Sequence, residues 1–207
     1  MNYFVTAIGT DSGKTLFSAM LAEALKGEYW KPVQAGYPTD TETITKLTAG
    51  SVYCHNERYV LNTPASPHFA ASVDGVEIVP DDLALPQTQN HLVIEGAGGA
   101  LVPINDDDFV IDLVPRFNAS ILLVSNLYLG SINHTMLTLE LIKQRGYPLT
   151  GIIFNGPANK ASEDIILKHH NVPCLLRIPE LETVNYAVIK QYAEILKSNL
   201  DELGNKG

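Results

Sequence analysis

The most restrictive feature of the sequence is a run that is apolar at every position, Ile121-Leu122-Leu123-Val124. Successive side chains of a strand point to opposite faces, so a strand of this composition must be covered on both faces. Strands buried in this way occur mainly in the middle of parallel sheets whose connecting helices pack on either side. The run therefore predicts an α/β fold with a central, mostly parallel sheet.

Strand-like runs alternate with helix-like segments along the chain. The predicted strands are Tyr3–Ala7, Tyr29–Val33, Leu92–Glu95, Ser120–Ser125, Ile152–Asn155 and Leu175–Ile178. The predicted helices, which carry apolar residues at helical spacing, are Thr15–Leu25, Met136–Gln144 and Val184–Leu200. Alternating strands and helices imply right-handed crossovers and a doubly wound sheet flanked by helices. In such sheets ligands bind beyond the carboxyl ends of the strands.

Length and composition indicate a single domain. The chain has 207 residues, of which 45% are hydrophobic and 18% are charged, as in ordinary globular proteins. We expect one domain over residues 1–200 and a frayed polar tail over residues 201–207. The segment Gly50–Gln89 is rich in Pro, Asn, Asp and Ser, and we expect it to decorate this domain. Its predicted elements are a short strand near Tyr59–Leu61 and helical turns near Pro67–Ser72 and Pro80–Leu85.

The charge balance limits the partners that we expect. The formal net charge is −9, so the surface repels phosphate backbones and nucleic acid is not expected as the main partner. No apolar run approaches the ~20 residues that span a bilayer, so no membrane is expected. A basic segment followed by an apolar one is absent at the start, which predicts no signal peptide. Cys54 and Cys174 show no metal-ligand spacing, and we expect buried free thiols in a cytoplasmic protein.

The segment Ile8-Gly9-Thr10-Asp11-Ser12-Gly13-Lys14-Thr15 follows the first predicted strand and precedes the first predicted helix. Glycine allows tight turns in which backbone N–H groups point at phosphate oxygens, and the helix N-terminus adds a positive end. Lys14 can reach the β- and γ-phosphates of a nucleotide, and the Thr15 hydroxyl can ligate Mg²⁺. The strict pattern would need glycine where Ile8 stands, and the alternative is an ordinary strand-to-helix turn with an exposed lysine.

Lys31 and Asp40 are ambiguous from the sequence alone. Lys31 lies in Trp30-Lys31-Pro32-Val33, where it is either a second cation facing a phosphoryl group or anionic substrate, or a lysine extending to solvent at the sheet edge. Asp40 begins a predicted helix in Thr39-Asp40-Thr41-Glu42, where a plain helix cap is the favoured reading of the local sequence.

Glu95 and Asn155 each end a predicted strand. Glu95 opens into Gly96-Ala97-Gly98-Gly99, the usual position of the acidic group that holds Mg²⁺ in P-loop enzymes, and the alternative is a turn carboxylate. Asn155 precedes Gly156-Pro157, and its amide either pairs with a purine edge or belongs to a common Asn-Gly turn.

Taken in order, these motifs resemble the dethiobiotin synthetase family of biotin synthesis. The resemblance runs from Tyr3 to about Asn185, and that family's phosphate loop also lacks the first glycine of the strict pattern. The matching blocks are Val5-Thr6, Gly13-Lys14-Thr15, Lys31-Pro32-Val33-Gln34-Ala35-Gly36, Thr39-Asp40, Pro64-Ala65-Ser66-Pro67-His68, Glu95-Gly96-Ala97-Gly98-Gly99, Leu129-Gly130-Ser131-Ile132-Asn133-His134-Thr135-Met136-Leu137-Thr138 and Ile178-Pro179.

The resemblance implies an ATP-dependent ligase of the P-loop type that converts 7,8-diaminononanoate and CO₂ or bicarbonate to dethiobiotin, with Mg²⁺ as cofactor. It implies a homodimer in which Gly130, Ser131, Ile132 and Asn133 of one subunit bind the substrate of the other, so that the site lies at the interface. The implied catalytic residues are Lys31, Lys14, Thr10 and Asp11, and Lys31 and Ala35 also face substrate. The implied metal ligands are Thr15, Asp40 and Glu95. The implied nucleotide contacts are Asp11, Ser12, Gly13, Lys14, Thr15, Leu16, Asp40, Glu95, Gly96, Ala97, Gly98, Asn155, Gly156, Pro179, Glu180 and Leu181.

Two positions depart from that family's pattern, and two other functions remain open at this point. Asp11 stands where the family usually has Glu, and Ala35 stands where it often has Ser or Thr. One alternative is a P-loop switch ATPase of the partitioning type, which makes no small-molecule product. The other is a nucleotide-binding regulator without catalysis.

Overall fold

The structure is a computed structural model that describes residues 1–205. Its strands are β1 Asn2–Ala7, β2 Glu28–Trp30, β3 Val33–Ala35, β4 Cys54–His55, β5 Tyr59–Leu61, β6 Leu92–Glu95, β7 Ala119–Asn126, β8 Leu149–Asn155 and β9 Cys174–Ile178. Within the described residues, seven strands form one sheet in the order β4-β2-β6-β1-β7-β8-β9, and β3 pairs with β5 in a separate sheet. Every strand pair is parallel, so the predicted fold class is confirmed.

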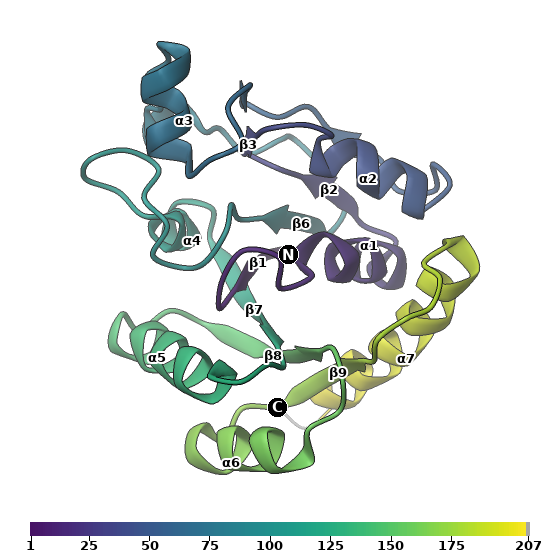
Figure 1. The fold of residues 1–207 in the computed structure, drawn as a ribbon. Coiled ribbons are helices and arrows are strands. Elements are labelled where there is room, and N and C mark those ends of the chain that lie inside the picture. The colour runs from purple at the N-terminus through teal and green to yellow at the C-terminus, as the bar shows by residue number, and fades with distance from the viewer. Residues whose placement is uncertain (206–207) are drawn as a thin grey trace.

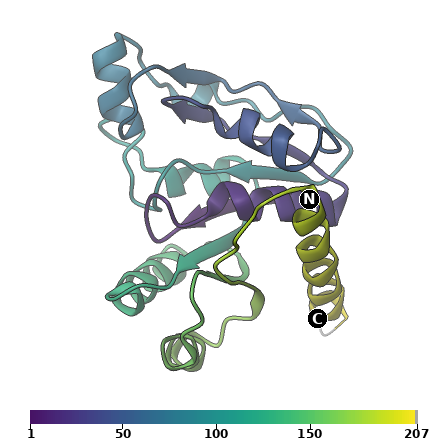
Figure 2. The ribbon, with the colours of Figure 1, turned by 45° about the vertical axis from the view of Figure 1, so that its right-hand side comes forward.

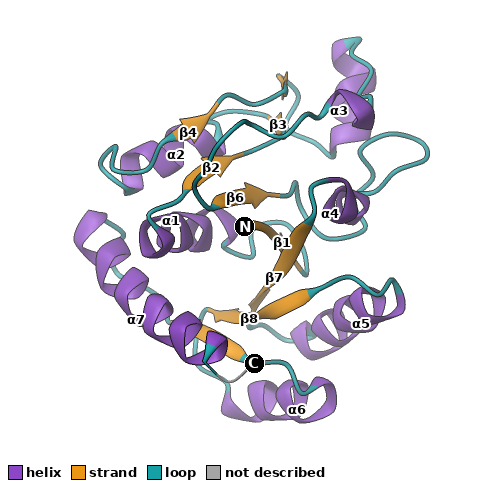
Figure 3. Cartoon of the chain, turned by 180° about the vertical axis from the view of Figure 1, so that it is seen from behind, coloured by secondary structure: helices purple, strands orange, loops and turns teal. Residues whose placement is uncertain are grey.

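Helices cover both faces of the large sheet. They are α1 Lys14–Leu25, α2 Asp40–Leu47, α3 Pro67–Asp74, α4 Leu113–Arg116, α5 Ser131–Gln144, α6 Lys160–His170 and α7 Tyr186–Gly204, with 3₁₀ turns η1 Pro80–Asp82 and η2 Val110–Asp112. Figures 1 and 2 show α1, α2 and α7 on one side of the sheet and α4, α5 and α6 on the other. The same two layers are visible from behind in Figure 3. The result is a doubly wound sheet between two helical layers.

The apolar run that predicted the sheet is buried on both faces. Ile121 and Leu123 belong to the core under α3, α4, α5 and α6. Leu122 and Val124 belong to the other core, under α1, α2 and α7. All four side chains are fully buried, as the alternating geometry of a central strand requires.

The predicted strand Tyr29–Val33 is wrong, because the chain leaves the large sheet in its middle. β2 ends at Trp30, and β3 begins at Val33 in the small sheet, beside Tyr59–Leu61. Pro32 has no N–H to donate to a sheet ladder, and its carbonyl accepts hydrogen bonds from the N–H groups of Arg58 and Tyr59 at the start of β5. Lys31 therefore stands at a break between two sheets.

Helix boundaries differ from the predictions at two places. α5 begins at Ser131 and not at Met136, since its first buried positions are the hydroxyl residues Ser131 and Thr135, which apolar spacing does not detect. α7 continues to Gly204, so the frayed tail predicted from residue 201 is wrong over residues 201–204. There, Leu203 packs partly buried against the core and extends the helix. Residues 206–207 of that predicted tail lie outside the described residues.

The segment Gly50–Gln89 contains the predicted strand and turns. β5 matches Tyr59–Leu61, while α3 and η1 lie at the two predicted helical turns. The segment packs on one face of the large sheet through four buried side chains, those of Tyr59, Leu61, Ile78 and Leu83. This shared core joins the segment to the rest of the domain.

Two further expectations concern single features of the chain. Cys54 and Cys174 are free thiols as expected, but they are half-buried and not fully buried. Over residues 1–205, no helix combines the length and the apolar character needed to cross a membrane.

Candidate active site

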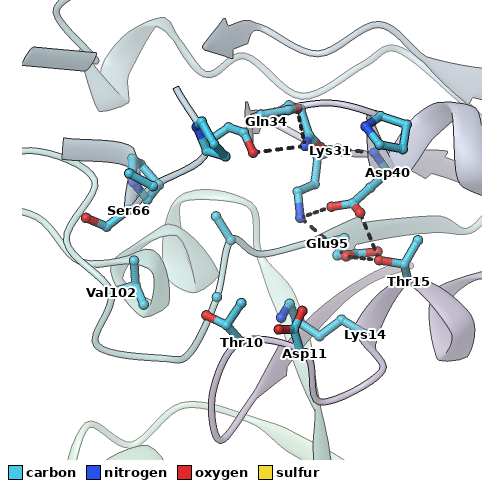
Figure 4. A pocket seen from close by; sticks show the side chains of 18 of the residues that line it. Thr10, Asp11, Lys14, Thr15, Lys31, Gln34, Asp40, Ser66, Glu95 and Val102 are labelled. Atoms are coloured by element: carbon cyan, nitrogen blue, oxygen red, sulfur yellow. Dashed lines mark hydrogen bonds and ion pairs between the residues drawn. The ribbon is translucent and has the colours of Figure 1, made fainter. Parts of the chain in front are cut away.

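A large cavity of about 790 Å³ lies at the carboxyl ends of the neighbouring strands β2, β6 and β1. Figure 4 shows the side chains that surround it. Its lining residues are Thr10, Asp11, Gly13, Lys14, Thr15, Leu16, Lys31, Gln34, Ala35, Gly36, Tyr37, Pro38, Asp40, Pro64, Ala65, Ser66, Pro67, Glu95, Ala97, Gly98 and Val102. The fold thus gathers most of the predicted site residues around one cavity.

The phosphate loop connects β1 to α1, with Gly13 as the residue that caps the helix. Gly13 has a φ of 93°, a left-handed conformation that side chains rarely adopt. A Cβ atom at Gly13 would lie 2.3 Å from Asn155 Nδ2, so the position has no room for a side chain. The N-terminus of α1, with its free backbone N–H groups, points at the cavity and suits an anion such as phosphate.

Three oxygen-bearing side chains converge beside this loop. Thr15 Oγ1 lies 3.0 Å from Asp40 Oδ1 and 2.9 Å from Glu95 Oε1. The Thr15 hydroxyl has one proton and can donate to only one carboxylate at a time. A lone pair of its oxygen therefore faces a lone pair of the other carboxylate. This arrangement suits a hard cation such as Mg²⁺, which prefers one or two carboxylates together with water and phosphate oxygens. Among residues 1–205 no group of three or more His, Cys, Asp or Glu side chains is placed to hold a metal.

Lys31 is buried against the same carboxylates. Its Nζ lies 2.7 Å from Asp40 Oδ2 and 3.3 Å from Glu95 Oε1, and it donates a hydrogen bond of 3.0 Å to the Gly96 carbonyl. The residue is only 4% exposed, so the alternative of a lysine extending to solvent is wrong. Figure 4 shows Lys31, Asp40, Glu95 and Thr15 as one connected group.

Burial and pairing act in opposite directions on these charges. Burial alone would lower the pKa of Lys31, but the carboxylates of Glu95 and Asp40 raise its pKa above the ordinary value. Burial would raise the pKa of Asp40, but the charge and hydrogen bond of Lys31 lower it. Burial lowers the pKa of Lys14, against the attraction of Glu95. The Lys31–Asp40 pair is therefore ionised at neutral pH.

Asp40 is the first residue of its helix and not the cap. Thr39 caps α2, accepting a hydrogen bond from the Glu42 N–H while the Glu42 side chain accepts one from the Thr39 N–H. The prediction that a helix begins at Asp40 is confirmed, and its side chain is free to point at Lys31 and Thr15.

Two side chains that the sequence analysis did not assign to the site hold these groups in place. Gln34 Oε1 accepts a hydrogen bond from the Asp40 N–H, and its Nε2 donates to the Gly36 carbonyl. Tyr29, on β2, donates from its hydroxyl to Glu95 Oε2 at 3.1 Å. A glutamine in an apolar strand was a usable signal, whereas a tyrosine in a predicted strand resembles any core residue.

The predicted nucleotide contacts at β8 and β9 lie beside the phosphate loop but outside the lining of the large cavity. Asn155 Nδ2 donates to the Ser12 carbonyl at 2.9 Å, and the Gly156 N–H donates to the Ile178 carbonyl at the end of β9. Pro179–Leu181 therefore follow directly beside Asn155. A contact between Asn155 and adenine stays a prediction.

The predicted substrate residues Gly130–Asn133 are separate from the cavity within one chain. They lie at the start of α5, where Gly130 and Ile132 line a smaller cavity of about 310 Å³. Ser131 is buried, while Ile132 and Asn133 are exposed. Lys31 and Ala35, the other two predicted substrate residues, line the large cavity.

The fold and the loop define a class of protein. A family model described as "AAA domain" matches residues 1–187. Among solved structures, the septum site-determining protein MinD of Pyrococcus horikoshii, complexed with Mg-ADP, superposes with a TM-score of 0.59 at 15% identity, covering 100% of this chain and 98% of that one. A ParA family ATPase from Chlorobium tepidum gives 0.55 at 17% identity, covering 97% and 90%. These identities show a common fold alone, that of the P-loop α/β proteins.

Closer relatives identify the family. The ATP-dependent dethiobiotin synthetase of Cytophaga hutchinsonii is 54% identical over 95% of this chain and 97% of its own length. That of Christiangramia forsetii is 44% identical over 98% and 99%. The chain belongs to the dethiobiotin synthetase family, as the motifs in its sequence predicted. The partitioning ATPases share its architecture but not its family.

We expect Gly13→Ala to weaken ATP binding at least about tenfold, a cost of roughly 1.4 kcal/mol. The added methyl group would strain a left-handed backbone and collide with Asn155. The control is Gly50→Ala, at a φ of 76° with nothing within 4 Å of the new Cβ and far from the cavity. Calorimetric titration with ATP measures both variants, and equal affinities would show that the loop does not need its glycine.

Proposed function

We propose that the chain carboxylates 7,8-diaminononanoate with CO₂ and closes the ureido ring at the expense of ATP, releasing dethiobiotin, ADP and phosphate. The observation that carries the proposal is the second buried lysine. Lys31 opens, with its two carboxylates, into the same cavity as the phosphate loop. A site with cations at two walls suits a phosphoryl group that is transferred to an anionic substrate.

The proposed reaction proceeds in three steps. One substrate amine adds to CO₂, forming a C–N bond and losing a proton to give a carbamate. A carbamate oxygen then attacks the γ-phosphorus, and the bond from the γ-phosphorus to the bridging oxygen breaks. The products are ADP and a mixed carbamic–phosphoric anhydride. The second amine attacks the carbonyl carbon, loses a proton and expels phosphate as the ring closes.

We assign the charges that develop in these steps to the two lysines. Lys14 would bind the β- and γ-phosphates, and Lys31 would stabilise the carbamate and the transferred group. Both are buried, which strengthens their electrostatic effect relative to water. Thr10 and Asp11 line the cavity and would face the diamine, at the wall shown opposite Gln34 and Ser66 in Figure 4.

Thr15, Asp40 and Glu95 would hold Mg²⁺, which when bound neutralises charge on the β- and γ-oxygens. Lys31 contacts the carboxylates of Asp40 and Glu95, so its positive charge offsets part of their negative charge. Backbone at Gly96–Gly98 would approach the phosphates.

The adenine would lie beyond the large cavity, at the ends of β8 and β9. The amide of Asn155 would pair with the purine edge, and Gly156 with Pro179–Leu181 would line the base pocket. The support for this placement is that Asn155 borders the phosphate loop through Ser12.

We also propose a homodimer, in a cytoplasmic location where ATP is available. None of Gly130–Asn133 lines the cavity that holds Lys31, and Gly130 and Ile132 line a different one, so the four would act on a substrate held at Lys31 of another chain. Beside them Leu129 is 103% exposed and Leu137 is 61% exposed, which is costly for apolar side chains in water. A second subunit that covers them would bring its own α5 N-terminus to the substrate carboxylate, a suitable anion site.

The overall reaction predicts a specific substrate dependence. Phosphate release from ATP should require both the diamine and bicarbonate, because the γ-phosphate has no acceptor until a carbamate forms. The measurement is phosphate released per minute with each substrate omitted in turn. Turnover that is indifferent to the diamine would contradict the proposal and favour a switch ATPase.

Lys31→Ala should lower the rate of dethiobiotin formation by at least about 10²–10³-fold, the usual effect of removing one preorganised transition-state contact. Nucleotide affinity should stay largely unchanged, since Lys14 and the loop remain. The control is Lys46→Ala, an exposed lysine on α2. Rate and ATP-analogue binding are measured on the same preparations, and wild-type turnover in Lys31→Ala would remove Lys31 from the mechanism.

Glu95→Gln should raise the Mg²⁺ concentration needed for half-maximal activity at least about tenfold. The amide keeps the size of the side chain but loses the charge that would hold the metal. Glu194→Gln, an exposed position on α7, is the matched control. An unchanged Mg²⁺ requirement would place Glu95 outside the metal shell.

A further inference from the structure

The phenol of Tyr29 has a hydrogen bond that the proposed mechanism does not use. Its hydroxyl donates to Glu95 Oε2 at 3.1 Å, and both residues are almost fully buried, at 0% and 1% exposure. Tyr29 belongs to the core under α1, α2 and α7, behind the cavity, and it does not line the cavity itself. Its ring is thus a core residue, while its hydroxyl reaches the functional carboxylate.

Sheet register explains how this contact arises. β2 and β6 are neighbours, with Tyr29 beside Val93 and Trp30 beside Ile94. Glu95 is two residues beyond Val93 on β6, so its side chain leaves the sheet on the same face as Val93 and Tyr29. The phenol can therefore reach along this face to the end of the next strand.

The two oxygens of Glu95 have different partners. Oε2 accepts from Tyr29, whereas Oε1 lies 2.9 Å from Thr15 Oγ1 and 3.3 Å from Lys31 Nζ. A buried carboxylate oxygen without a donor is costly, so the Tyr29 contact keeps one oxygen turned toward the core and sets the orientation of the carboxylate. The other oxygen is left to face the cavity.

We propose that Tyr29 is a positioning residue that holds the Glu95 carboxylate with Oε1 presented to the metal and phosphate side of the cavity. This inference rests on the proposed function, in which Glu95 holds Mg²⁺. Partners behind a metal ligand commonly set its orientation, and losing one costs about 10–100-fold in metal affinity or activity.

Tyr29→Phe tests the inference, since it keeps the ring and removes only the hydroxyl. In this variant Glu95 Oε2 loses its donor, and the carboxylate is free to turn both oxygens toward Lys31 and Thr15. We expect Mg²⁺ affinity of the complex with the β,γ-imido analogue of ATP to fall about tenfold. Calorimetric titration of that complex with Mg²⁺ measures it without turnover, and the KM for the diamine should not change.

The matched control is Tyr3→Phe. Tyr3 is a buried tyrosine on β1 in the same core, next to His91 and away from the cavity. The Tyr3→Phe variant should bind Mg²⁺ with the same affinity as the wild type. Equal Mg²⁺ affinity in Tyr29→Phe and wild type, or an equal loss in both tyrosine variants, would overturn the inference.

A double-mutant cycle separates this inference from the function on which it rests. If Tyr29 acts through Glu95, Tyr29→Phe should cause no further loss of Mg²⁺ affinity in a Glu95→Gln background. A full additional loss there would overturn the positioning role alone. If Glu95→Gln itself leaves Mg²⁺ affinity intact, the proposed metal site fails, whatever Tyr29 does.

Discussion

The site depends on holding the charged side chains of Lys14, Lys31 and Glu95, with the half-buried Asp40, together where little water reaches the first three. Lys14 and Lys31 are 7% and 4% exposed, and Glu95 is 1% exposed. A buried charge that loses its partner costs about 3–5 kcal/mol, so no member of such a group is tolerated alone. Lys31 contacts both Asp40 and Glu95, and its positive charge offsets the repulsion between the two carboxylates. Both can therefore lie within hydrogen-bonding distance of the Thr15 hydroxyl.

The order of the strands in the sheet brings these charged side chains together. β2, β6 and β1 are adjacent, so the residues that follow their carboxyl ends, Lys31, Gly96 and the phosphate loop, emerge at one edge. Tyr29 and Gln34 then fix Glu95 and Asp40 from behind. This cluster of charged side chains is thus supported by core side chains and by helix α2, not by loops alone.

The phosphate loop borders both Asn155 and the large cavity. Gly13 lies against Asn155, and Asp11 lines the large cavity with a φ of 56°. Aspartate adopts this left-handed conformation more readily than most residues. Ala35 lines the same cavity, and since its side chain carries no polar atom it offers only its backbone for hydrogen bonding.

Local patterns in the sequence determined the layered fold, the phosphate loop, the start of α2 at Asp40 and the position of Glu95 at a strand end. Each of these follows from residues close together in the chain: Ile121–Val124 must be covered on both faces, and Gly13-Lys14-Thr15 must open a helix. Only the tertiary structure decided that the chain breaks at Lys31 and Pro32, that Lys31 is buried and not extended to solvent, and that Tyr29 and Gln34 support the carboxylates. These features depend on which strands become neighbours and which side chains meet across them, and a buried lysine or a core tyrosine has the same local sequence whether or not a carboxylate lies opposite.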